Sequence, residues 1–376
     1  MIYLDNAATT MPSEAAKNAM LAAAEKFGNP SSLYGLGLEA EKLINGSRTT
    51  IASMLGVDKK EIFFTSGGTE ANNMAVFGAA YARQKRGRHI VTTKIEHPSV
   101  LECFKRLEQE GFEVTYLDVT PEGVPEISML NDILREDTIL VSIMYVNNET
   151  GMITPVEKIK PIMRKLSPNA VLHCDCVQAF GKIPVKPKVW GADMISISSH
   201  KIHGYKGTGA LYIKNGIKLR PIICGGEQQE EIRPGTENVG GILAFGAAAS
   251  ECDTDNFSLA EFRKKFKNRI LDSIDNVEIN GADENNSGSV INISFLGIKS
   301  EILLHALERY EIYVSTGSAC SSHKPSPSHV LAAMGKSREA IASAVRISFD
   351  KPLSDEDMEY TVESIKKEVE NIRRYM

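Results

Sequence analysis

Short apolar runs alternate with segments of helical period along the first two thirds of this chain, and this alternation limits its fold more than any other feature. The strand-like runs cover residues 61–65, 89–93, 113–117, 139–145, 171–174, 193–197 and 210–213. Between most of them lie helix-forming segments such as 100–110 and 155–166. This repetition predicts an α/β fold whose mainly parallel sheet is covered by helices on both faces. Such sheets bind ligands at the carboxyl ends of their strands.

The sequence changes in character from about residue 259. Strand-like runs at 277–280, 290–295 and 345–348 and helical segments predict a smaller α+β unit. A last helix begins after Ser354, and its apolar residues are Met358, Val362, Ile365, Val369 and Ile372. Helical spacing puts these side chains on one face, so we expect them to pack in the core of the smaller unit.

Composition excludes several classes of protein. The 376 residues are enough for two or three domains, and the net charge of −5 argues against a nucleic-acid-binding surface. We see no signal peptide and no apolar run of membrane-spanning length. The six cysteines lack the spacing of a disulfide scaffold, so we expect a cytoplasmic protein with reduced thiols.

Lys201 follows the strand-like run 193–197 and stands beside Ser198, Ser199 and His200. Desolvation at a buried strand end can lower the pKa of a lysine and supply the neutral amine that a Schiff base requires. The neighbouring hydroxyls and imidazole could bind an anionic group on the same ligand. A solvated loop lysine is the plainer alternative, so the other strand ends must decide.

A glycine turn and an acidic strand end add candidate ligand groups. In the segment 63–72, Gly68 and Thr69 stand where a strand passes into a helix, and the helix N–H groups there could hold an anion. A plain strand-to-helix turn would use glycines as well. Asp175 ends the apolar run 171–174, and a buried carboxylate needs a partner such as a protonated heterocyclic nitrogen.

His173, Cys174 and Cys176 raise the alternative of a zinc site. Strand alternation separates the two sulfurs from the imidazole, and no second ligand pair follows at metal spacing. We therefore expect no metal, and we expect both cysteines to behave as small buried hydrophobic residues.

Further polar residues follow other strands. His97 comes after the run 89–93, and Asn148 comes after 139–145. A single histidine is more often structural than catalytic. Several polar strand ends at one sheet edge, however, favour a functional site.

Two residues of the second unit are also candidates. Cys320 lies among small and hydroxyl residues, as an exposed nucleophile would, although it could be an incidental thiol. Arg346 interrupts an apolar strand, so its guanidinium must pair with a carboxylate of the protein or of a ligand.

Taken together, these motifs resemble those of the cysteine desulfurases of the NifS/IscS type, within the class V aminotransferase group of pyridoxal-phosphate (PLP) enzymes. The matching segments are 3–10, 28–32, 65–72, 96–97, 147–151, 175–178, 198–201, 233–238, 318–320 and 345–348. The resemblance implies a homodimer in which residues 12–257 form a large PLP-binding domain with a seven-stranded sheet. Residues 1–11 and 258–376 would form a small α+β domain that carries the cysteine loop.

The resemblance also implies roles for single residues. Lys201 would hold PLP as a Schiff base, Asp175 would pair with the ring nitrogen, Gln178 would contact the ring hydroxyl and His97 would stack on the ring. The other implied cofactor contacts are Gly68, Thr69, Asn148, Ser198, His200 and, from the second subunit, Thr236. The substrate carboxylate would be bound by Arg346, Asn148 and Asn29.

The implied reaction converts L-cysteine to L-alanine and leaves the sulfur as a persulfide on Cys320, with Lys201 and His97 as further catalytic residues. The segment 327–331 looks like the subgroup that serves iron–sulfur cluster assembly and tRNA thiolation, so a protein of either pathway would accept the sulfur. No direct contact with nucleic acid or membrane is expected. The departures from the family pattern are Tyr34, Cys176, Tyr205 and Pro234, and none of them has an assigned chemical role.

Two alternatives stay open at this stage. One is a selenocysteine lyase or another class V PLP enzyme, which would have less need of the Cys320 thiol. The other is a non-catalytic sulfur-transfer scaffold, which would have no reason to retain Lys201, Asp175 and His97.

Overall fold

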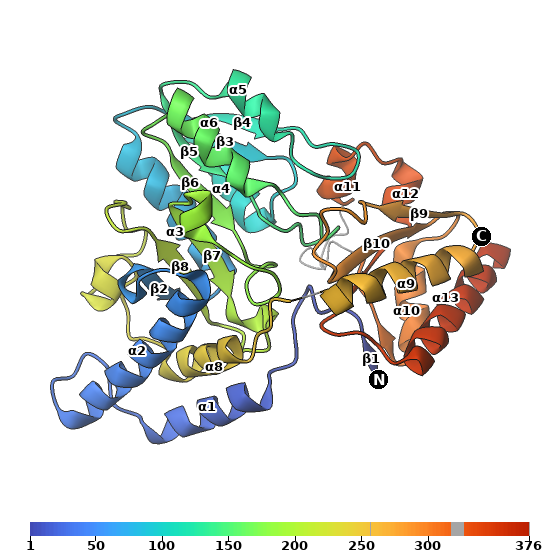
Figure 1. The fold of residues 1–376 in the computed structure, drawn as a ribbon, viewed down its shortest axis with the longest axis horizontal. Helices are drawn as coiled ribbons and strands as arrows, with labels where there is room; N and C mark the ends of the chain where they lie inside the picture. Colours follow the sequence, from blue (N-terminus) through green and yellow to red (C-terminus); the bar gives the residue numbers. More distant parts are fainter. Residues whose placement is uncertain (256, 317–326, 376) are drawn as a thin grey trace.

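The computed structural model describes residues 1–255, 257–316 and 327–375, which form a large α/β unit beside a smaller unit (Figure 1). The strands of the large unit are β2 (Ile62–Thr65), β3 (His89–Thr93), β4 (Glu113–Leu117), β5 (Thr138–Ser142), β6 (Val171–Asp175), β7 (Met194–Ser198) and β8 (Gly209–Ile213). They form one seven-stranded sheet in the order β2-β8-β7-β6-β5-β3-β4. Each strand-like run of the sequence is one of these strands, so the predicted sheet is confirmed.

Strand direction gathers the strand ends at one edge of the sheet. β7, β6, β5, β3 and β4 pair in parallel, whereas β8 is antiparallel to both of its neighbours, β2 and β7. β2 therefore runs in the same direction as the parallel strands. The chain leaves β2, β3, β5, β6 and β7 at a shared carboxyl edge, where a ligand site is expected.

The predicted run 139–145 is longer than the strand that forms, because β5 ends at Ser142. Beyond it, the N–H of Ile143 still donates to the carbonyl of His173 at 3.1 Å, and that of Tyr145 donates to Asp175 at 2.9 Å. Residues 143 and 145 thus remain hydrogen-bonded to β6, although the regular strand β5 ends at Ser142.

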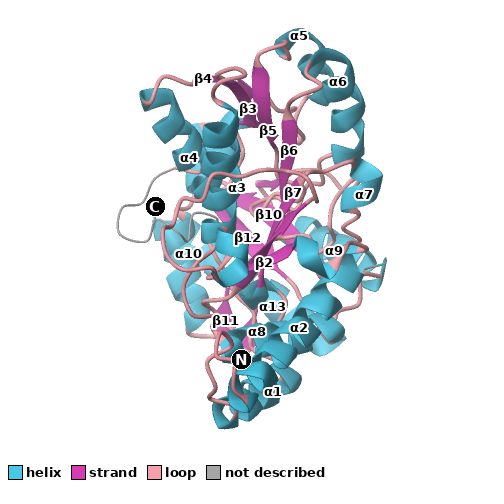
Figure 2. Ribbon diagram, turned by 90° about the vertical axis from the view of Figure 1, so that its left-hand side faces the viewer, coloured by secondary structure: helices cyan, strands magenta, loops and turns pink. Residues whose placement is uncertain are grey.

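Helices cover both faces of this sheet (Figure 2). Those of the large unit are α1 (Glu14–Glu25), α2 (Gly35–Leu55), α3 (Gly68–Arg83), α4 (Pro98–Gln109), α5 (Leu130–Ile133), α6 (Ile159–Leu166), α7 (Pro187–Trp190) and α8 (Val239–Ser250). α3 and α4 share one apolar core with the sheet, and α2, α6 and α8 share the other. In the described part of the chain, no helix is both long and apolar enough to cross a membrane.

The smaller unit is built on two further sheets. One is the antiparallel sheet of β9 (Val277–Asn280), β10 (Val290–Phe295) and β12 (Ala344–Ser348), and the other pairs β1 (Ile2–Tyr3) with β11 (Ile312–Tyr313). Its helices are α9 (Phe257–Ser273), α10 (Ser300–Glu308), α11 (His329–Ala333), α12 (Arg338–Ala342) and α13 (Asp355–Tyr375). The apolar stripe predicted on the last helix packs in this unit's core.

A crossing segment, residues 5–10, carries the chain from β1 in the smaller unit to α1 in the large one. On the smaller-unit side, Asn6 donates to the carbonyl of Ser348 at 2.9 Å, and the N–H of Ala7 donates to the Ser348 hydroxyl at 2.9 Å. On the large-unit side, the N–H of Thr10 donates to the carbonyl of His200 at 2.9 Å. The segment therefore joins both units through backbone and side-chain hydrogen bonds.

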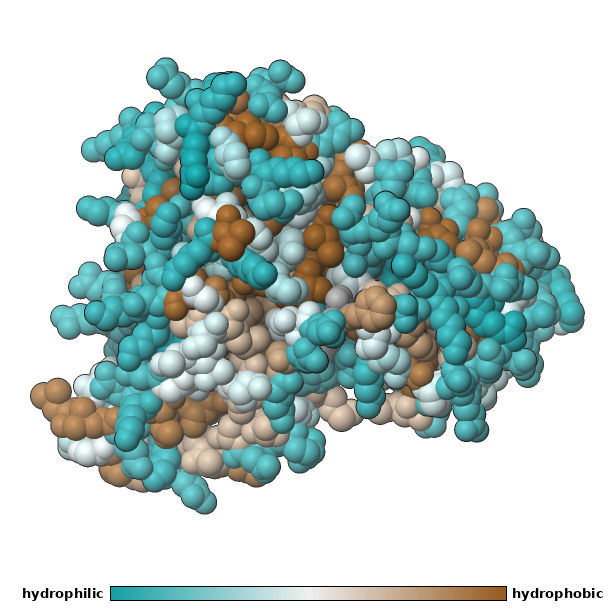
Figure 3. Space-filling model, viewed as in Figure 1, coloured by the Kyte–Doolittle hydropathy of each residue, from teal (hydrophilic) through white to brown (hydrophobic). Residues whose placement is uncertain are grey.

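Apolar side chains gather on the surface over the connection between α1 and α2, at the lower left of Figure 3. We call this the apolar patch; its residues are Leu21, Phe27, Leu33, Tyr34, Leu36 and Leu38. The exposed fraction is 92% for Leu33 and 80% for Phe27. Contiguous exposed apolar groups of this kind usually mark a protein interface.

Candidate active site

A cavity of about 200 Å³ opens at the carboxyl edge of the large sheet. The residues that line it are Ala8, Gly68, Thr69, Asn72, His97, Ser99, Met144, Asn148, Asp175, Val177, Gln178, Ser198, His200 and Lys201. Every predicted cofactor-binding residue except Thr236 is among them. The parallel strands explain this convergence, because each delivers its following residues to the same edge.

Lys201 lies in a short turn directly after β7. Its Nζ donates to the carbonyl of Ala7 at 2.7 Å and to that of Ala8 at 2.6 Å. Both carbonyls belong to the crossing segment. The amine is therefore held at the junction of the two units, on the wall of the cavity.

One end of the cavity is suited to an anion. α3 begins at Gly68, where a Cβ would lie only 2.7 Å from Cγ2 of Val177, so only glycine permits this close approach. The Ser198 hydroxyl is buried here and has no hydrogen-bond partner among the described residues. The free N–H groups of the helix, the Thr69 hydroxyl and this unpartnered hydroxyl together form an anion site.

His200 lies at the same end, and burial, aided by Lys201 and Lys206, lowers its pKa to about 4. Its Nδ1 is 3.2 Å from the hydroxyl of Thr9. The imidazole is thus neutral at pH 7 and can offer one N–H to a ligand.

A hydrogen-bonded chain links the histidine and the carboxylate of the cavity. His97 caps α4, and its Nδ1 accepts from the N–H of Ser99 at 3.1 Å and lies 2.8 Å from the Ser99 hydroxyl. Asn72 donates from Nδ2 to that hydroxyl at 2.8 Å and to Asp175 Oδ2 at 2.7 Å. Asp175 Oδ1 accepts from the N–H of Val177 at 2.9 Å. Both carboxylate oxygens are therefore held in place.

Burial lowers the pKa of His97, and although Asp175 opposes this effect, Lys201 adds to it. The histidine is consequently neutral at pH 7. A neutral ring can lie against an aromatic ligand without adding a positive charge to the cavity.

Two residues of this hydrogen-bonded chain, Asn72 and Ser99, were not predicted as site residues. Asn72 ends the segment 63–72 and Ser99 follows His97 by two residues, but the sequence indicated no role for either. Asn72 lies one helical turn after Gly68, and Ser99 is the second residue after the capping histidine. Those spacings are the only sequence signal that could have placed both residues beside the cavity.

Arg346 is buried in β12, and its Nη2 forms an ion pair with Asp5 at 2.7 Å. Nη1 donates to the carbonyl of Asn148 at 3.0 Å. The expected carboxylate partner is thus a residue of the protein. Its buried Nε has no hydrogen-bond partner among the described residues.

Three predicted site residues, Arg346, Asn29 and Thr236, do not line this cavity. Asn29 and Thr236 are exposed and lie outside its lining. Cys320 lies outside the described residues.

The three residues that raised the alternative of a zinc site contact hydroxyl groups or the apolar core instead. His173 bridges the hydroxyls of Ser142 and Ser196 at 2.8 and 2.9 Å, while Cys174 and Cys176 are buried in the apolar core. Among the residues that the structure describes, no group of three or more His, Cys, Asp or Glu side chains could hold a metal ion.

The cavity fits the cofactor that the sequence motifs suggest. An unpartnered hydroxyl at a helix N-terminus suits a phosphate, the Lys201 amine suits an aldehyde, and a fixed carboxylate suits a protonated ring nitrogen. All three groups open onto one space.

Comparison with known proteins gives one family match, one relative and two solved structures. The aminotransferase class-V family profile matches residues 2–360. A protein from Dictyoglomus turgidum named "Cysteine desulfurase IscS" is 42% identical over 99% of this chain and 95% of its own length. A solved "NifS-like protein" shares 36% identity with a TM-score of 0.92, covering 98% of this chain and 99% of that one. A structure named "SspA in complex with cysteine" shares 31% identity with a TM-score of 0.83, covering 94% and 100%.

Glu96 lies beside the cavity histidine and is fully buried. Its Oε1 accepts from the Thr93 hydroxyl at 2.7 Å and from the N–H of Met144 at 2.9 Å. Burial raises the pKa of Glu96 to about 8. The folded protein therefore holds a protonated carboxyl here, whereas the unfolded chain loses that proton near pH 4.5.

We expect Glu96→Gln to change how stability depends on pH. The raised pKa contributes stability that is complete below about pH 4.5 and is lost as the pH rises through about 8. A glutamine is neutral at every pH, so thermal unfolding should show similar stabilities near pH 5 and a variant more stable by about 3 kcal/mol near pH 9. Glu108→Gln, on the exposed side of α4, is the control. An equal difference at both pH values would contradict the assignment.

Proposed function

The chain belongs to the aminotransferase class-V family, and from that premise we propose that it is a cysteine desulfurase that uses pyridoxal phosphate to convert L-cysteine into L-alanine. The observation that carries this proposal is the meeting of Lys201, Asp175 and the anion site around Ser198 in one cavity. The names of the relatives agree with it.

The residues of the cavity would hold the cofactor at three points. Lys201 would bind its aldehyde, Asp175 its ring nitrogen and Gln178 its ring hydroxyl. The phosphate would be bound by Gly68, Thr69, Ser198 and His200. When bound, the cofactor supplies an aldehyde that joins to amino groups and a protonated ring that withdraws electron density.

Each residue's surroundings support its proposed task. Asn72 and the N–H of Val177 fix the Asp175 carboxylate, so that it can keep a proton on the ring nitrogen. Lys201 would carry the Cα proton of the substrate as a general base. The neutral His97 would lie against the ring. These tasks need no movement of the sheet that bears the residues.

The substrate carboxylate would be bound by Arg346 together with Asn148 and Asn29. Arg346 is already oriented by Asp5 and by the Asn148 carbonyl, and its Nε has no hydrogen-bond partner among the described residues. A guanidinium held in this way is suited to a carboxylate because its N–H groups have a fixed geometry.

Cys320 would accept the sulfur. Its thiolate would attack the substrate sulfur, and the C–S bond would break with its electron pair left on the substrate carbon. That carbon would take up a proton, so that a persulfide on Cys320 and alanine would result. The described residues on both sides of 317–326 are anchored near the cavity: Ser315 pairs with Arg346 through both backbone groups, and the Ser328 hydroxyl donates to Glu149 at 2.5 Å. The few residues from Ser315 to Cys320 span at most about 18 Å when fully extended.

We propose a homodimer. Asn29 and Thr236 are exposed outside their own chain's cavity, so each would act at the cavity of a second copy. The apolar patch, which includes Phe27 and Leu33, would lie in the interface. The final sulfur acceptor would be a protein of iron–sulfur cluster assembly or of tRNA thiolation.

Incubation of the cofactor-loaded protein with L-cysteine and a dithiol reductant, which releases the persulfide sulfur, should yield alanine and sulfide. We expect Cys320→Ala to lose persulfide formation, measured by mass spectrometry, while the visible absorption band of the cofactor remains. Cys224→Ala, which removes an exposed thiol elsewhere, should behave as the unaltered protein. Absence of alanine from the unaltered protein would overturn the function, and turnover by Cys320→Ala at the native rate would overturn the role of Cys320.

Charges in the apolar patch should separate the dimer. The double variant Phe27→Glu/Leu33→Glu should elute as a monomer in size-exclusion chromatography with light scattering and should bind the cofactor at least about tenfold more weakly, since Thr236 of the second copy is lost. Val189→Glu, at an exposed apolar position on α7, should remain dimeric. A monomeric native protein with full cofactor affinity would refute the interface.

A further inference from the structure

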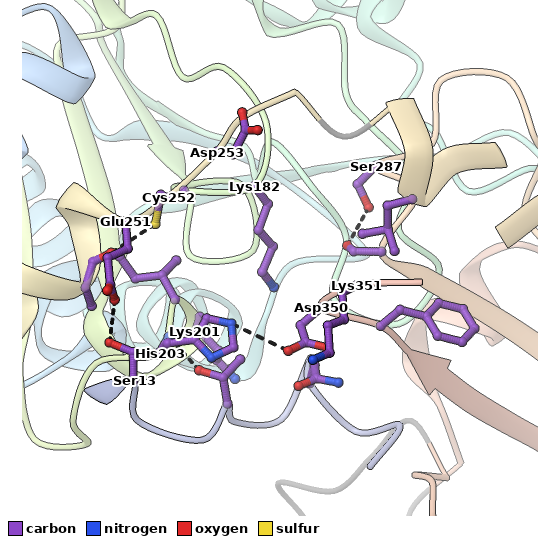
Figure 4. A pocket seen from close by; sticks show the side chains of 18 of the residues that line it. Ser13, Lys182, Lys201, His203, Glu251, Cys252, Asp253, Ser287, Asp350 and Lys351 are labelled. Atoms are coloured by element: carbon purple, nitrogen blue, oxygen red, sulfur yellow. Dashed lines mark hydrogen bonds and ion pairs between the residues drawn. The ribbon is translucent and has the colours of Figure 1, made fainter. Parts of the chain in front are cut away.

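A second cavity of about 320 Å³ lies between the two units, and Lys201 borders it as well as the first. Lys182 extends into this space toward Lys201 and Asp350 (Figure 4). No step of the proposed reaction uses Lys182, although its side chain lies close to the residues that do.

Tight packing fixes the backbone that carries Lys182. The preceding Gly181 has a φ of +75°, and a Cβ there would lie 2.7 Å from both Cys252 Sγ and Ile202 Cγ2. Cys252 follows α8 and Ile202 follows Lys201 in the chain. The position of Lys182 is thus tied to the turn that bears the catalytic amine.

Lys182 donates from Nζ to Oε1 of Gln178 at 3.2 Å. Gln178 in turn donates from Nε2 to the carbonyl of Ala7 at 2.9 Å. That carbonyl also accepts from Lys201 at 2.7 Å. A continuous chain of hydrogen bonds therefore runs from Lys182 through Gln178 to the point where Lys201 binds.

These contacts determine which way the Gln178 amide faces. An ammonium can only donate a hydrogen bond, and a backbone carbonyl can only accept one. Lys182 therefore requires the amide oxygen on its side, and Ala7 requires the amide nitrogen on the other. Because both neighbours demand the same orientation, the amide presents N–H groups, and not its oxygen, to the crossing segment.

The charges around Lys182 leave this contact intact. Burial lowers the pKa of Lys182 to about 7, Lys201 and Arg346 add to the effect, and Asp350 and Cys252 oppose it. The other charged or titratable groups around the cavity are His203, Glu251, Asp253, Asp255 and Lys351. Both the ammonium and the neutral amine carry an N–H that can donate to Gln178, but only the ammonium, which cannot accept, strictly requires the amide oxygen on its side.

We propose that Lys182 is a positioning residue: it holds the Gln178 amide so that an N–H, rather than the carbonyl oxygen, meets the ring hydroxyl of the cofactor. This inference rests on the proposed function. An N–H stabilises a negatively charged ring oxygen, whereas an amide oxygen repels it. Without Lys182, only the Ala7 carbonyl favours this orientation, so the amide turns over more readily and the bound cofactor should keep its proton to higher pH.

The test titrates each cofactor-loaded variant with pH and measures the midpoint, which is the pH at which the change in the cofactor's visible absorption band is half complete. Lys182→Met removes the donor, and we expect it to raise the midpoint by about one pH unit. Lys182→Arg keeps a donor and should stay within about 0.3 units of the native value. Lys188→Met, on the exposed surface of α7, should not move it.

The same substitution in a Gln178→Leu protein separates the effect on the amide orientation from the loss of a nearby charge. If Lys182 acts through the amide, Lys182→Met should shift the midpoint much less in a Gln178→Leu protein than in the native one. An equal shift in both backgrounds, or no shift in either, would overturn the inference. Neither result would touch the proposed function, which fails only if the native protein shows no cofactor band and forms no alanine.

The test of Lys182 remains decisive if a variant loses the cofactor. Loss of the band in Lys182→Met with its retention in Lys182→Arg would support the role of the donor, provided that thermal unfolding remains cooperative in both. Loss of the band in both variants, with cooperative unfolding intact, would contradict it.

Discussion

The hydrogen bonds from Lys201 to the carbonyls of Ala7 and Ala8 are the contacts on which the rest of the site depends. They join the turn after β7 to the crossing segment, which the smaller unit holds through Asn6 and Ser348. Asp5, in the same segment, orients Arg346. A single stretch of backbone thereby aligns the amine, the amide of Gln178 and the guanidinium, although these groups lie far apart in the sequence.

The parallel sheet supplies the second constraint. Its strands deliver the anion site, His97, Asp175 and Lys201 to one edge, and a helix begins after β2 and after β3. Helix N-termini at that edge favour negative charge. Hydrogen bonds from Asn72 and Ser99 then hold the polar groups in place without a flexible loop. The chemistry of the site therefore follows from the direction of the strands.

The strands of the large sheet and most residues of the cavity were predictable from the sequence. Buried parallel strands are continuous apolar runs, so their positions were evident, and polar residues after such runs were expected at the shared edge. Contacts between distant segments were not predictable. The pairing of Arg346 with Asp5 spans almost the whole chain, and the hydrogen bond from Gln178 to the carbonyl of Ala7 joins segments that no shared motif connects. The end of β5 was missed because buried apolar residues continue beyond the regular strand.

We propose that Lys201, and not another amine at the junction of the two units, bonds to the cofactor. Borohydride reduction of the loaded protein makes that link permanent, and peptide mass spectrometry then identifies the lysine. We predict a pyridoxyl group on Lys201 alone. Its appearance on Lys182 or Lys206, or the absence of any labelled lysine, would contradict this account of the site.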